Sequence, residues 1–315
     1  MWIRVLGSAA GGGFPQWNCG CANCRGVREK TIRATARTQE SVAVSASGDA
    51  WVLLNASPEI RQQIESFEPL HPRGPRHSPI AAIVLTNGDL DHCLGVLSLR
   101  ESHPITVYAT DQVRRGFTEK NVLYRTLERF PGQVTWRRLV LGHPQDVVGA
   151  DAPGAGAPIE RHAPIGLSVE AIAVPGKPPV HLEDLPASPE DSVGLLIRDA
   201  VAGVTLAYFS GVGEISPAVA DTLAGADCVF FDGTFWSSDE LTAGGLGTKR
   251  AEQMAHLPVG GPDGSLARLT GLSAVRKILI HVNNTNPVLR EDSRERARVE
   301  AGGWEIAYDG MEITL

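Results

Sequence analysis

The sequence predicts an α/β fold in which two mixed β-sheets pack face to face and helices cover the outside. Three observations support this prediction. Short apolar segments rich in β-branched residues recur along all 315 residues, as expected of buried strands. Strand-like segments come first and then alternate with helix-like segments, which suits two packed sheets with outer helices. No break in composition marks a second domain, so we expect one domain over residues 1–315.

The expected strands are apolar runs of roughly four to eight residues, most of them separated by turn-forming Gly, Pro, Asn or Asp. Runs of this length and composition are typical of strands buried inside a sandwich. The expected strands are Trp2–Leu6, Val42–Ala46, Trp51–Leu54, Ile80–Leu85, Thr106–Ala109, Leu167–Val174, Val193–Ile197, Val204–Phe209, Cys228–Asp232, Lys277–Val282, Trp304–Tyr308 and Glu312–Leu315.

Helix signals fall between some of these strands. Ser57-Pro58 resembles an N-cap followed by Pro at the first helical position, and it opens a helix over Ile60–Phe67. Asp111–Arg129 and Glu291–Ala301 also fit helices, and Gly302-Gly303 ends the second of them.

Two Pro/Gly-rich stretches, at about residues 149–166 and 175–191, are interpreted as surface loops. The alternative is that one of them covers a functional site.

The composition excludes several classes of protein. At 43% hydrophobic residues the chain can bury a sizeable core, and a net charge of −7 argues against a general nucleic-acid role. The longest apolar runs are about strand length, so no membrane span is expected. The N-terminus, Met1–Gly7, is too short for a signal peptide and leads into Gly-rich turns. We therefore expect a cytoplasmic protein.

Three cysteines, Cys19, Cys21 and Cys24, lie close together in a loop expected at residues 17–25. In a cytoplasmic protein, Cys-x-Cys-x2-Cys indicates metal rather than disulfides, and zinc prefers tetrahedral thiolate and imidazole sites. The alternative is three free thiols. A structural zinc site needs a fourth ligand, and three candidates stay open: His256, His281 and Asn284.

A second group of metal-binding residues stands at the ends of expected strands. Asp91 and His92 follow the apolar run Ile80–Leu85 through a short loop, and His281 closes the run that begins at Lys277. Polar residues that end apolar strands commonly face a site at the rim of the sheet. For His281 the alternative is a hydrogen-bonded structural histidine.

Further polar residues are ambiguous. Asp232 also ends an apolar run, and it is interpreted as a metal ligand, an acceptor that supports a ligand, or a strand-end cap. His256 lies in a helical run, Arg250–Leu257, where a functional and a structural role are equally open. Asn283–Asn286 is interpreted as bracing the ligands or as a turn. Gly11–Gly13 lacks the Lys of a phosphate-binding loop, so we expect a tight turn near the metal centre.

Five longer strings carry a family resemblance. They are Gly7–Cys19, Arg37–Gln39, Asn55–Pro58, Leu97–Glu101 and His281–Pro287. Through these strings the chain resembles the pyrroloquinoline quinone (PQQ) biosynthesis protein B family, within the metallo-β-lactamase-fold superfamily, from its first strand to Asp309–Met311. The resemblance implies a four-layer αββα sandwich and a role in making the redox cofactor PQQ.

For this family the resemblance implies an iron-dependent oxygenase. It would hydroxylate the tyrosine ring of a Glu-Tyr dipeptide released from a precursor peptide, with Fe(II) at the active site and zinc at the cysteine loop. An older interpretation is a carrier that exports PQQ. Phosphodiesterase relatives place a His, as fourth zinc ligand, where this chain has Asn284.

The resemblance also maps two metal sites of hydrolytic relatives onto this chain. At the ligand positions of the first metal stand Asn87, Asp89 and Lys177, and Val212 replaces the bridging carboxylate. The ligands of the second metal are intact, because Asp91, His92 and His281 match the family motif.

Two imidazoles and one carboxylate with open positions are typical of non-haem Fe(II) oxygenases, and the lost partner metal argues against hydrolysis. Asp89 is a candidate for an additional metal ligand, or for the base that takes the phenol proton if Asp91 raises its pKa. Lys177 is a candidate for pairing with substrate carboxylates or for filling the vacated metal position. Arg37 and Arg100 are further candidates for carboxylates, or else form surface ion pairs.

Three functional classes therefore remain, with the oxygenase preferred over a carrier of PQQ and over a degenerate hydrolase. The expected partners are a Glu-Tyr-type dipeptide, O2 and PQQ or a PQQ precursor, with no nucleic acid and no membrane. A homodimer is left open.

Overall fold

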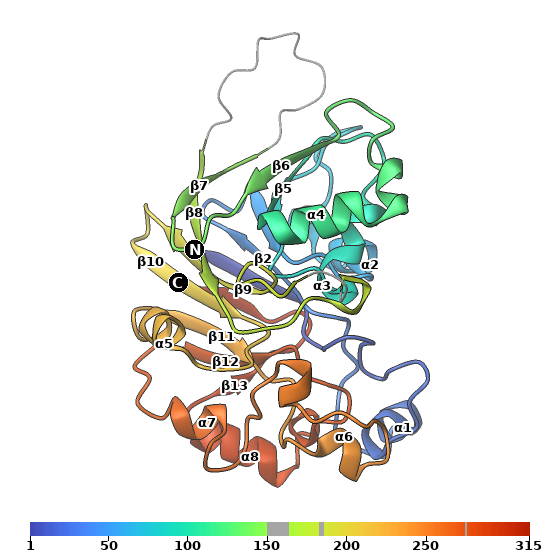
Figure 1. Ribbon diagram of the computed structural model, residues 1–315, viewed down its shortest axis with the longest axis vertical. Coiled ribbons are helices and arrows are strands. Elements are labelled where there is room, and N and C mark those ends of the chain that lie inside the picture. The colour runs from blue at the N-terminus through green and yellow to red at the C-terminus, as the bar shows by residue number, and fades with distance from the viewer. Residues whose placement is uncertain (150–163, 183–185, 275) are drawn as a thin grey trace.

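The computed structural model describes residues 1–149, 164–182, 186–274 and 276–315. Two seven-stranded mixed sheets lie face to face, and helices cover the outer face of each (Figure 1). The predicted αββα sandwich is therefore confirmed.

The first sheet is built from the N-terminal half of the chain and closes with the last strand. Its strands β1, β2 and β3 pair antiparallel, whereas β3 to β6 run parallel. The strand order is β14 (Glu312–Thr314), β1 (Trp2–Gly7), β2 (Ser41–Ser45), β3 (Trp51–Leu54), β4 (Ile80–Val84), β5 (Ile105–Ala109) and β6 (Val134–Arg138).

The second sheet repeats this arrangement with the C-terminal half. Strands β7 to β10 pair antiparallel and β10 to β13 run parallel. The order is β13 (Glu305–Ile306), β12 (Arg276–Ile280), β11 (Cys228–Asp232), β10 (Val204–Phe209), β9 (Val193–Asp199), β8 (Pro164–Ala173) and β7 (Gln145–Val148).

Apolar side chains form three layers that match this architecture. One cluster, which includes Val42, Val84 and Leu195, lies between the two sheets. Of the other two clusters, one lies beneath the outer helices of the first sheet and one beneath those of the second. Because strands of both sheets bury both faces, they are near-continuous apolar runs. The α-helices are α1 (Ala22–Glu29), α2 (Ile60–Glu65), α3 (Leu90–Cys93), α4 (Asp111–Glu119), α5 (Pro217–Ala224), α6 (Glu240–Ala243), α7 (Ser265–Arg268) and α8 (Arg294–Ala301).

Several predicted helices were wrong in their bounds. Helix α2 begins after Glu59, and no side chain caps it, so Ser57 is not its N-cap. The segment predicted as one helix over residues 111–129 breaks after α4, because Asn121 accepts a hydrogen bond from Leu123 N–H and starts a separate 3₁₀ turn at Val122–Thr126. Ser293, whose side chain caps α8, delays the start of that helix to Arg294. The run at 250–257 contains only the short 3₁₀ turn Glu252–Met254.

Loops and edge strands also departed from prediction. Strands β6 and β7 were not predicted, because their sequences mix apolar with charged residues at a half-exposed edge. The cysteine loop expected at 17–25 is partly helical, since α1 begins at Ala22. Strand β8 starts at Pro164, inside the loop expected at 149–166, and residues 150–163 of that loop lie outside the described residues. The loop at 175–191 contains a 3₁₀ turn, Val180–Leu182.

Within the described part of the chain, no helix has both the length and the hydropathy needed to cross a bilayer.

Candidate metal centre

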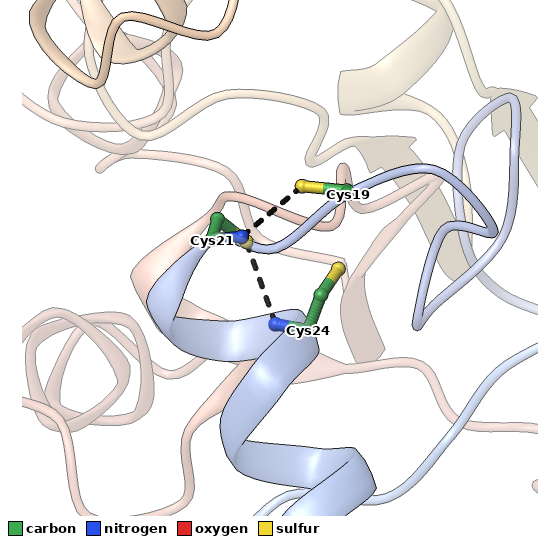
Figure 2. Close-up of side chains that lie close together, drawn as sticks. All are labelled: Cys19, Cys21 and Cys24. Carbon is green, nitrogen blue, oxygen red and sulfur yellow. Dashed lines mark hydrogen bonds between the residues drawn. The ribbon is translucent and has the colours of Figure 1, made fainter.

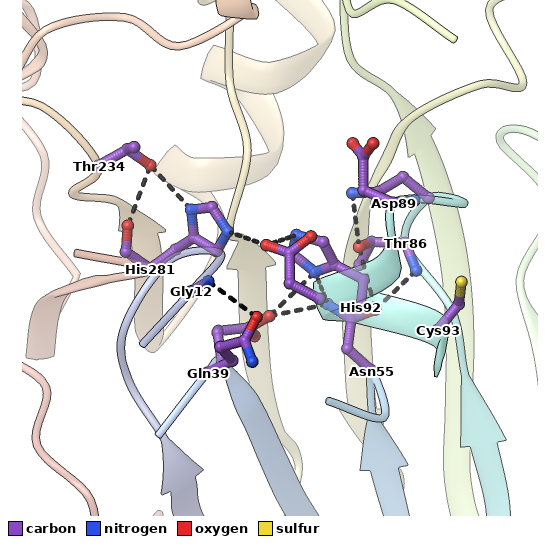
Figure 3. A network of polar contacts seen from close by, with 12 residues as sticks. Gly12, Gln39, Asn55, Thr86, Asp89, His92, Cys93, Thr234 and His281 are labelled. Carbon is purple, nitrogen blue, oxygen red and sulfur yellow. Dashed lines mark hydrogen bonds and ion pairs between the residues drawn. The ribbon is translucent and has the colours of Figure 1, made fainter. Parts of the chain in front are cut away.

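The predicted ligands Asp91, His92 and His281 meet at one edge of the sandwich. Asp91 and His92 lie on α3, just beyond β4, and His281 directly follows β12 of the other sheet. The Oδ2 atom of Asp91 is 3.1 Å from His281 Nε2 and 3.5 Å from His92 Nε2. The two imidazole rings stack with their centroids 4.9 Å apart. Figure 3 shows the two imidazoles approaching each other from opposite sides of the site.

These three residues form a donor set that suits a transition metal. Each offers one ligand atom, and the three atoms lie within 4.8 Å of one another. Two imidazoles and one carboxylate bind iron, manganese, zinc or copper, and they leave coordination positions open for other molecules.

The His92 imidazole is held by groups that the sequence analysis missed. Its Nδ1 lies 3.1 Å from Glu40 Oε2 and 2.7 Å from Asn55 Nδ2. Asn55 Oδ1 in turn accepts hydrogen bonds from the backbone and side chain of Thr86. A carboxylate on Nδ1 fixes the tautomer that directs the Nε2 lone pair toward a metal. The only sequence signal was an acidic residue directly before a buried strand.

The His281 imidazole is held by Thr234 and, behind it, Asp232. Thr234 Oγ1 lies 2.8 Å from His281 Nδ1 and donates to Asp232 Oδ1 at 2.6 Å. The backbone of His281 has a φ of 59°, a conformation that non-glycine residues adopt at some energetic cost. Register pairing of Asp232 with Ile280 across β11 and β12 places this support beside the ligand.

Asp232 acts as a supporting acceptor in this geometry, which was one of its three predicted alternatives. Its Oδ2 accepts from Val212 N–H at 2.8 Å and lies 2.7 Å from His256 Nδ1, while Oδ1 also accepts from Thr234 N–H. Asp232, His256 and His281 do bring ligand atoms within 4.8 Å of one another. Both oxygens of Asp232 are nevertheless engaged within the protein, which leaves no free lone-pair direction for a metal.

A cavity of about 250 Å³ opens over this cluster. Asn87, Asp89 and Lys177 line it, as the mapping onto the vacated metal position implied. Asn87 Oδ1 accepts from Asp89 N–H at 2.9 Å. Val212 stands where hydrolytic relatives have the bridging carboxylate. It is fully buried, and only its backbone N–H takes part in the site, as a hydrogen-bond donor to Asp232. His256 also lines the cavity.

The carboxyl pKa values of Asp89 and Asp91, the two aspartates of the cavity, are shifted in opposite directions. Burial opposes ionisation of Asp91, but the imidazoles of His92 and His281 hold the pKa of its carboxyl well below the usual range. Burial and then the neighbouring Asp91 raise the pKa of Asp89. Burial opposes the charged form of His92, yet Asp91 and Glu40 raise the pKa of the imidazole to about 9. A metal that binds here would have to compete with a proton on His92.

The turn at Gly11–Gly13 passes the metal centre, as the sequence predicted. A Cβ atom on Gly11 would lie 3.2 Å from Asp91 Oδ2, so a larger residue would crowd the ligand. Gly12 N–H donates to Gln39 Oε1 at 2.9 Å, which fixes the turn (Figure 3).

The cysteine cluster is a separate group of three thiols (Figure 2). The sulfur atoms of Cys19, Cys21 and Cys24 lie within 4.8 Å of one another. Cys21 caps α1, because its sulfur accepts from Cys24 N–H at 3.4 Å. Burial raises the pKa of the Cys24 thiol to about 11, so a bound metal would have to displace its proton.

Asn284 is the predicted fourth-ligand candidate that lies at this cluster. The end of its side-chain amide is 3.2 Å from Cys19 Sγ and 3.3 Å from Cys24 Sγ. A half turn of the amide exchanges its NH2 and carbonyl oxygen, so the same position can offer an oxygen ligand. His256 and His281 lie at the other cluster, and their candidacy for the cysteine site was therefore wrong.

The segment Asn283–Asn286 connects the two clusters rather than bracing the imidazoles directly. Asn283 N–H donates to Thr234 O at 3.0 Å, and Asn286 Nδ2 donates to Gly233 O at 2.9 Å. On the other side, Asn23 Nδ2 donates to the carbonyls of Asn284 and Asn286.

Two of the three cations considered for carboxylate binding lie away from the metal centre. Arg37 is buried and lines a different cavity of about 290 Å³. Arg100 is exposed and lies 4.0 Å from Glu101. Lys177 alone of the three faces the metal cavity.

Comparison with known proteins gives consistent matches. Residues 50–282 match the family model described as a beta-lactamase superfamily domain. The chain is 44% identical to coenzyme PQQ synthesis protein B of Pseudomonas entomophila and 45% identical to that of Azotobacter vinelandii, each over the full length of both chains. Among solved structures, zinc-bound PqqB from Methylobacterium extorquens matches with a TM-score of 0.90 and 41% identity over the whole of both chains. A diphosphatase of the PhnP family matches with a TM-score of 0.66 and 21% identity, which shows a shared fold.

Proposed function

This chain belongs to the coenzyme PQQ synthesis protein B family, and from that premise we propose that it is an iron-dependent oxygenase. Its proposed substrate is a Glu-Tyr dipeptide derived from a precursor peptide, which it hydroxylates on the tyrosine ring. One oxygen atom of O2 replaces a ring hydrogen as a hydroxyl group. The other leaves as water, with two electrons and two protons from an external reductant.

The observation that carries this proposal is the donor set of Asp91, His92 and His281. Bound Fe(II) would supply the redox chemistry that activates O2, and this set leaves positions open for O2 and substrate. The positions that hold the other metal in hydrolytic relatives are Asn87, Asp89 and Lys177, which do not form a second imidazole-rich site. Two-metal hydrolysis needs a second Lewis acid, so this difference favours oxidation over hydrolysis.

The remaining residues of the cavity hold ligands, charge and protons. Glu40 and Thr234 each engage the Nδ1 atom of one histidine, which keeps both Nε2 atoms directed at the metal position. The ammonium group of Lys177 would pair with a substrate carboxylate. Asp89, with a raised pKa, would take part in proton transfer to and from the bound substrate.

The test is a reconstitution of metal-free protein with ferrous iron under anaerobic conditions. Glu-Tyr, ascorbate and then O2 are added, and the product is analysed by mass spectrometry. We expect a gain of one oxygen atom that requires iron and is absent from His281→Ala protein. Zinc-loaded protein is the matched control, because zinc has no redox chemistry. No oxygen incorporation, together with tight binding of PQQ itself, would contradict the oxygenase and favour a carrier.

A further inference from the structure

His256 contributes a side chain to the metal cavity that the ligand set does not use. Its ring is 18% exposed and lies on the cavity wall. Its donor atoms do not join the group formed by Asp91, His92 and His281. The nearest imidazole is that of His281, whose ring stacks on it at 5.5 Å between centroids, with 22° between the planes.

The orientation of His256 is fixed by a buried carboxylate. Asp232 is fully buried, and its Oδ2 lies 2.7 Å from His256 Nδ1. The short contact places the Nδ1 proton between the two groups, as in other carboxylate–histidine pairs. Within the described part of the chain, His256 Nε2 has no hydrogen-bond partner. The free polar atom of this ring is therefore Nε2.

Two ring contacts hold His256 in place beside the ligands. One face stacks on His281, which itself stacks on His92, so three nearly parallel imidazoles form a row. Phe235, another residue of the cavity wall, contacts His256 edge to face at 5.9 Å between centroids. The cavity thus offers an aromatic wall next to a fixed polar atom, which suits an aromatic ligand that carries one hydroxyl group.

We propose that His256 Nε2 binds the hydroxyl group of the substrate's aromatic ring and that Asp232 positions His256 for this contact. The inference rests on the proposed function, because it takes a tyrosine ring as the ligand. A phenol both donates and accepts hydrogen bonds, so the contact forms whichever partner supplies the proton. Recognition of the hydroxyl would distinguish tyrosine from phenylalanine, since a site built to hydrogen-bond a hydroxyl binds an analogue without it poorly.

A role of His256 as a fourth metal ligand fits the distances less well. The group that includes His256 consists of Asp232 and His281, not of Asp91 and His92. Because Asp232 is occupied by Val212, Thr234 and His256 itself, this second group is a hydrogen-bonded support.

The experiment compares two peptides and two variants by calorimetry. Zinc-loaded protein is titrated with Glu-Tyr and with Glu-Phe, because zinc allows binding without turnover. We expect the native protein to bind Glu-Tyr about tenfold more tightly than Glu-Phe, the strength of one hydrogen bond. His256→Asn keeps an amide nitrogen near the position of Nδ1, where it can still donate to Asp232, but lacks Nε2. His256→Gln instead places its amide near the position of Nε2.

We expect the preference for Glu-Tyr to fall to about one in His256→Asn and to recover in part in His256→Gln. Zinc content and circular dichroism check that each variant is folded. Equal binding of both peptides to the native protein, or an unchanged preference in His256→Asn, would overturn the role of His256 alone. Failure of Glu-Tyr to bind the native protein would overturn it together with the proposed substrate.

Discussion

The two candidate metal-binding clusters of this protein differ in how the fold brings their residues together. The cysteine cluster takes its three thiols from one short stretch, Cys19–Cys24, and a single amide, that of Asn284, faces them. The cluster of Asp91, His92 and His281 joins residues 190 positions apart in the chain, from both sheets. Carboxylates support both of its imidazoles, Glu40 directly and Asp232 through Thr234.

From this difference we infer a structural role for the cysteine cluster and a chemical role for the cluster of Asp91, His92 and His281. A metal bound by three thiols of one short stretch would cross-link that stretch and add to the free energy of folding. Imidazoles held from behind by carboxylates are already oriented before a metal arrives. The short segment from His281 to Asn286 joins the two clusters. The clusters share no residue, so each should still be separable by substitution.

The largest effect is expected from His281→Ala. Removal of one of three ligands should weaken metal binding at the Asp91 cluster by more than about 100-fold, since even loss of a supporting group costs about 10- to 100-fold. Elemental analysis after dialysis would measure this loss, with the metal of the cysteine site expected to remain. Loss of both metals together would show that the clusters are not independent.

Cys24→Ala should leave the metal of the Asp91 cluster in place. We expect loss of the metal at the cysteine site and a destabilisation of about 4 kcal/mol when free zinc exceeds its dissociation constant about 1,000-fold. Thermal unfolding with and without a chelator measures the effect. Cys228→Ala is the matched control, because Cys228 is buried in β11 and lies outside the cluster. If both variants keep the same zinc content, the cysteine cluster is not a zinc site.

The segment between the clusters is tied to α6 by Glu240, whose side chain accepts hydrogen bonds from Thr285 Oγ1 and Trp236 N–H. Burial raises the pKa of this carboxyl from 4.5 to about 7. The folded protein therefore holds the Glu240 proton more tightly than the unfolded chain does. This contribution favours folding at low pH and is lost as pH rises through about 7.

Converted at about 1.4 kcal/mol for each pKa unit, the shift from 4.5 to about 7 corresponds to about 3 kcal/mol. Glu240→Gln places a neutral amide where the protonated carboxyl stands. The free energy of unfolding of this variant should therefore depend less on pH between 5 and 8 than that of the native protein. Denaturant unfolding at both pH values tests this, with Glu252→Gln at an exposed site as control. An identical pH dependence in native protein and Glu240→Gln would contradict the assignment.

The smallest effect is expected from Glu40→Gln, which removes the charge behind His92 but keeps a hydrogen-bond acceptor. Metal affinity at the Asp91 cluster should fall by about 10- to 100-fold. Metal-buffered titration measures this change, and Thr234→Val provides the matched change behind His281. No effect of either variant would mean that the ligands are held by packing alone.

The fold was largely predictable because both sheets are buried on both faces. Trp51–Leu54, Val204–Phe209 and Cys228–Asp232 are continuous apolar runs, and their strands match the prediction to the residue. Strands β6 and β7 escaped prediction because they lie at the sheet ends and mix apolar with polar residues. Helix bounds failed where local caps such as Asn121 and Ser293 decided them.

The site was predictable only where its residues closely follow predicted strands. Asp91, His92 and His281 stand at such positions and match a known motif, so the sequence could identify them. Glu40 and Thr234 could not be found in this way, because only tertiary structure brings them to the imidazoles. The pairing of Asp232 with His256 was missed because the residues are 24 positions apart and the intervening chain is irregular.

The most direct test of the central claim traces the oxygen atom. Iron-loaded protein with Glu-Tyr and ascorbate is supplied with oxygen-18 gas in ordinary water, and the hydroxylated dipeptide is analysed by mass spectrometry. Oxygenation at the Asp91, His92 and His281 centre predicts that the new ring hydroxyl carries the label. Native protein that yields only unlabelled hydroxyl from water, or His281→Ala protein that yields the same labelled product, would contradict the account.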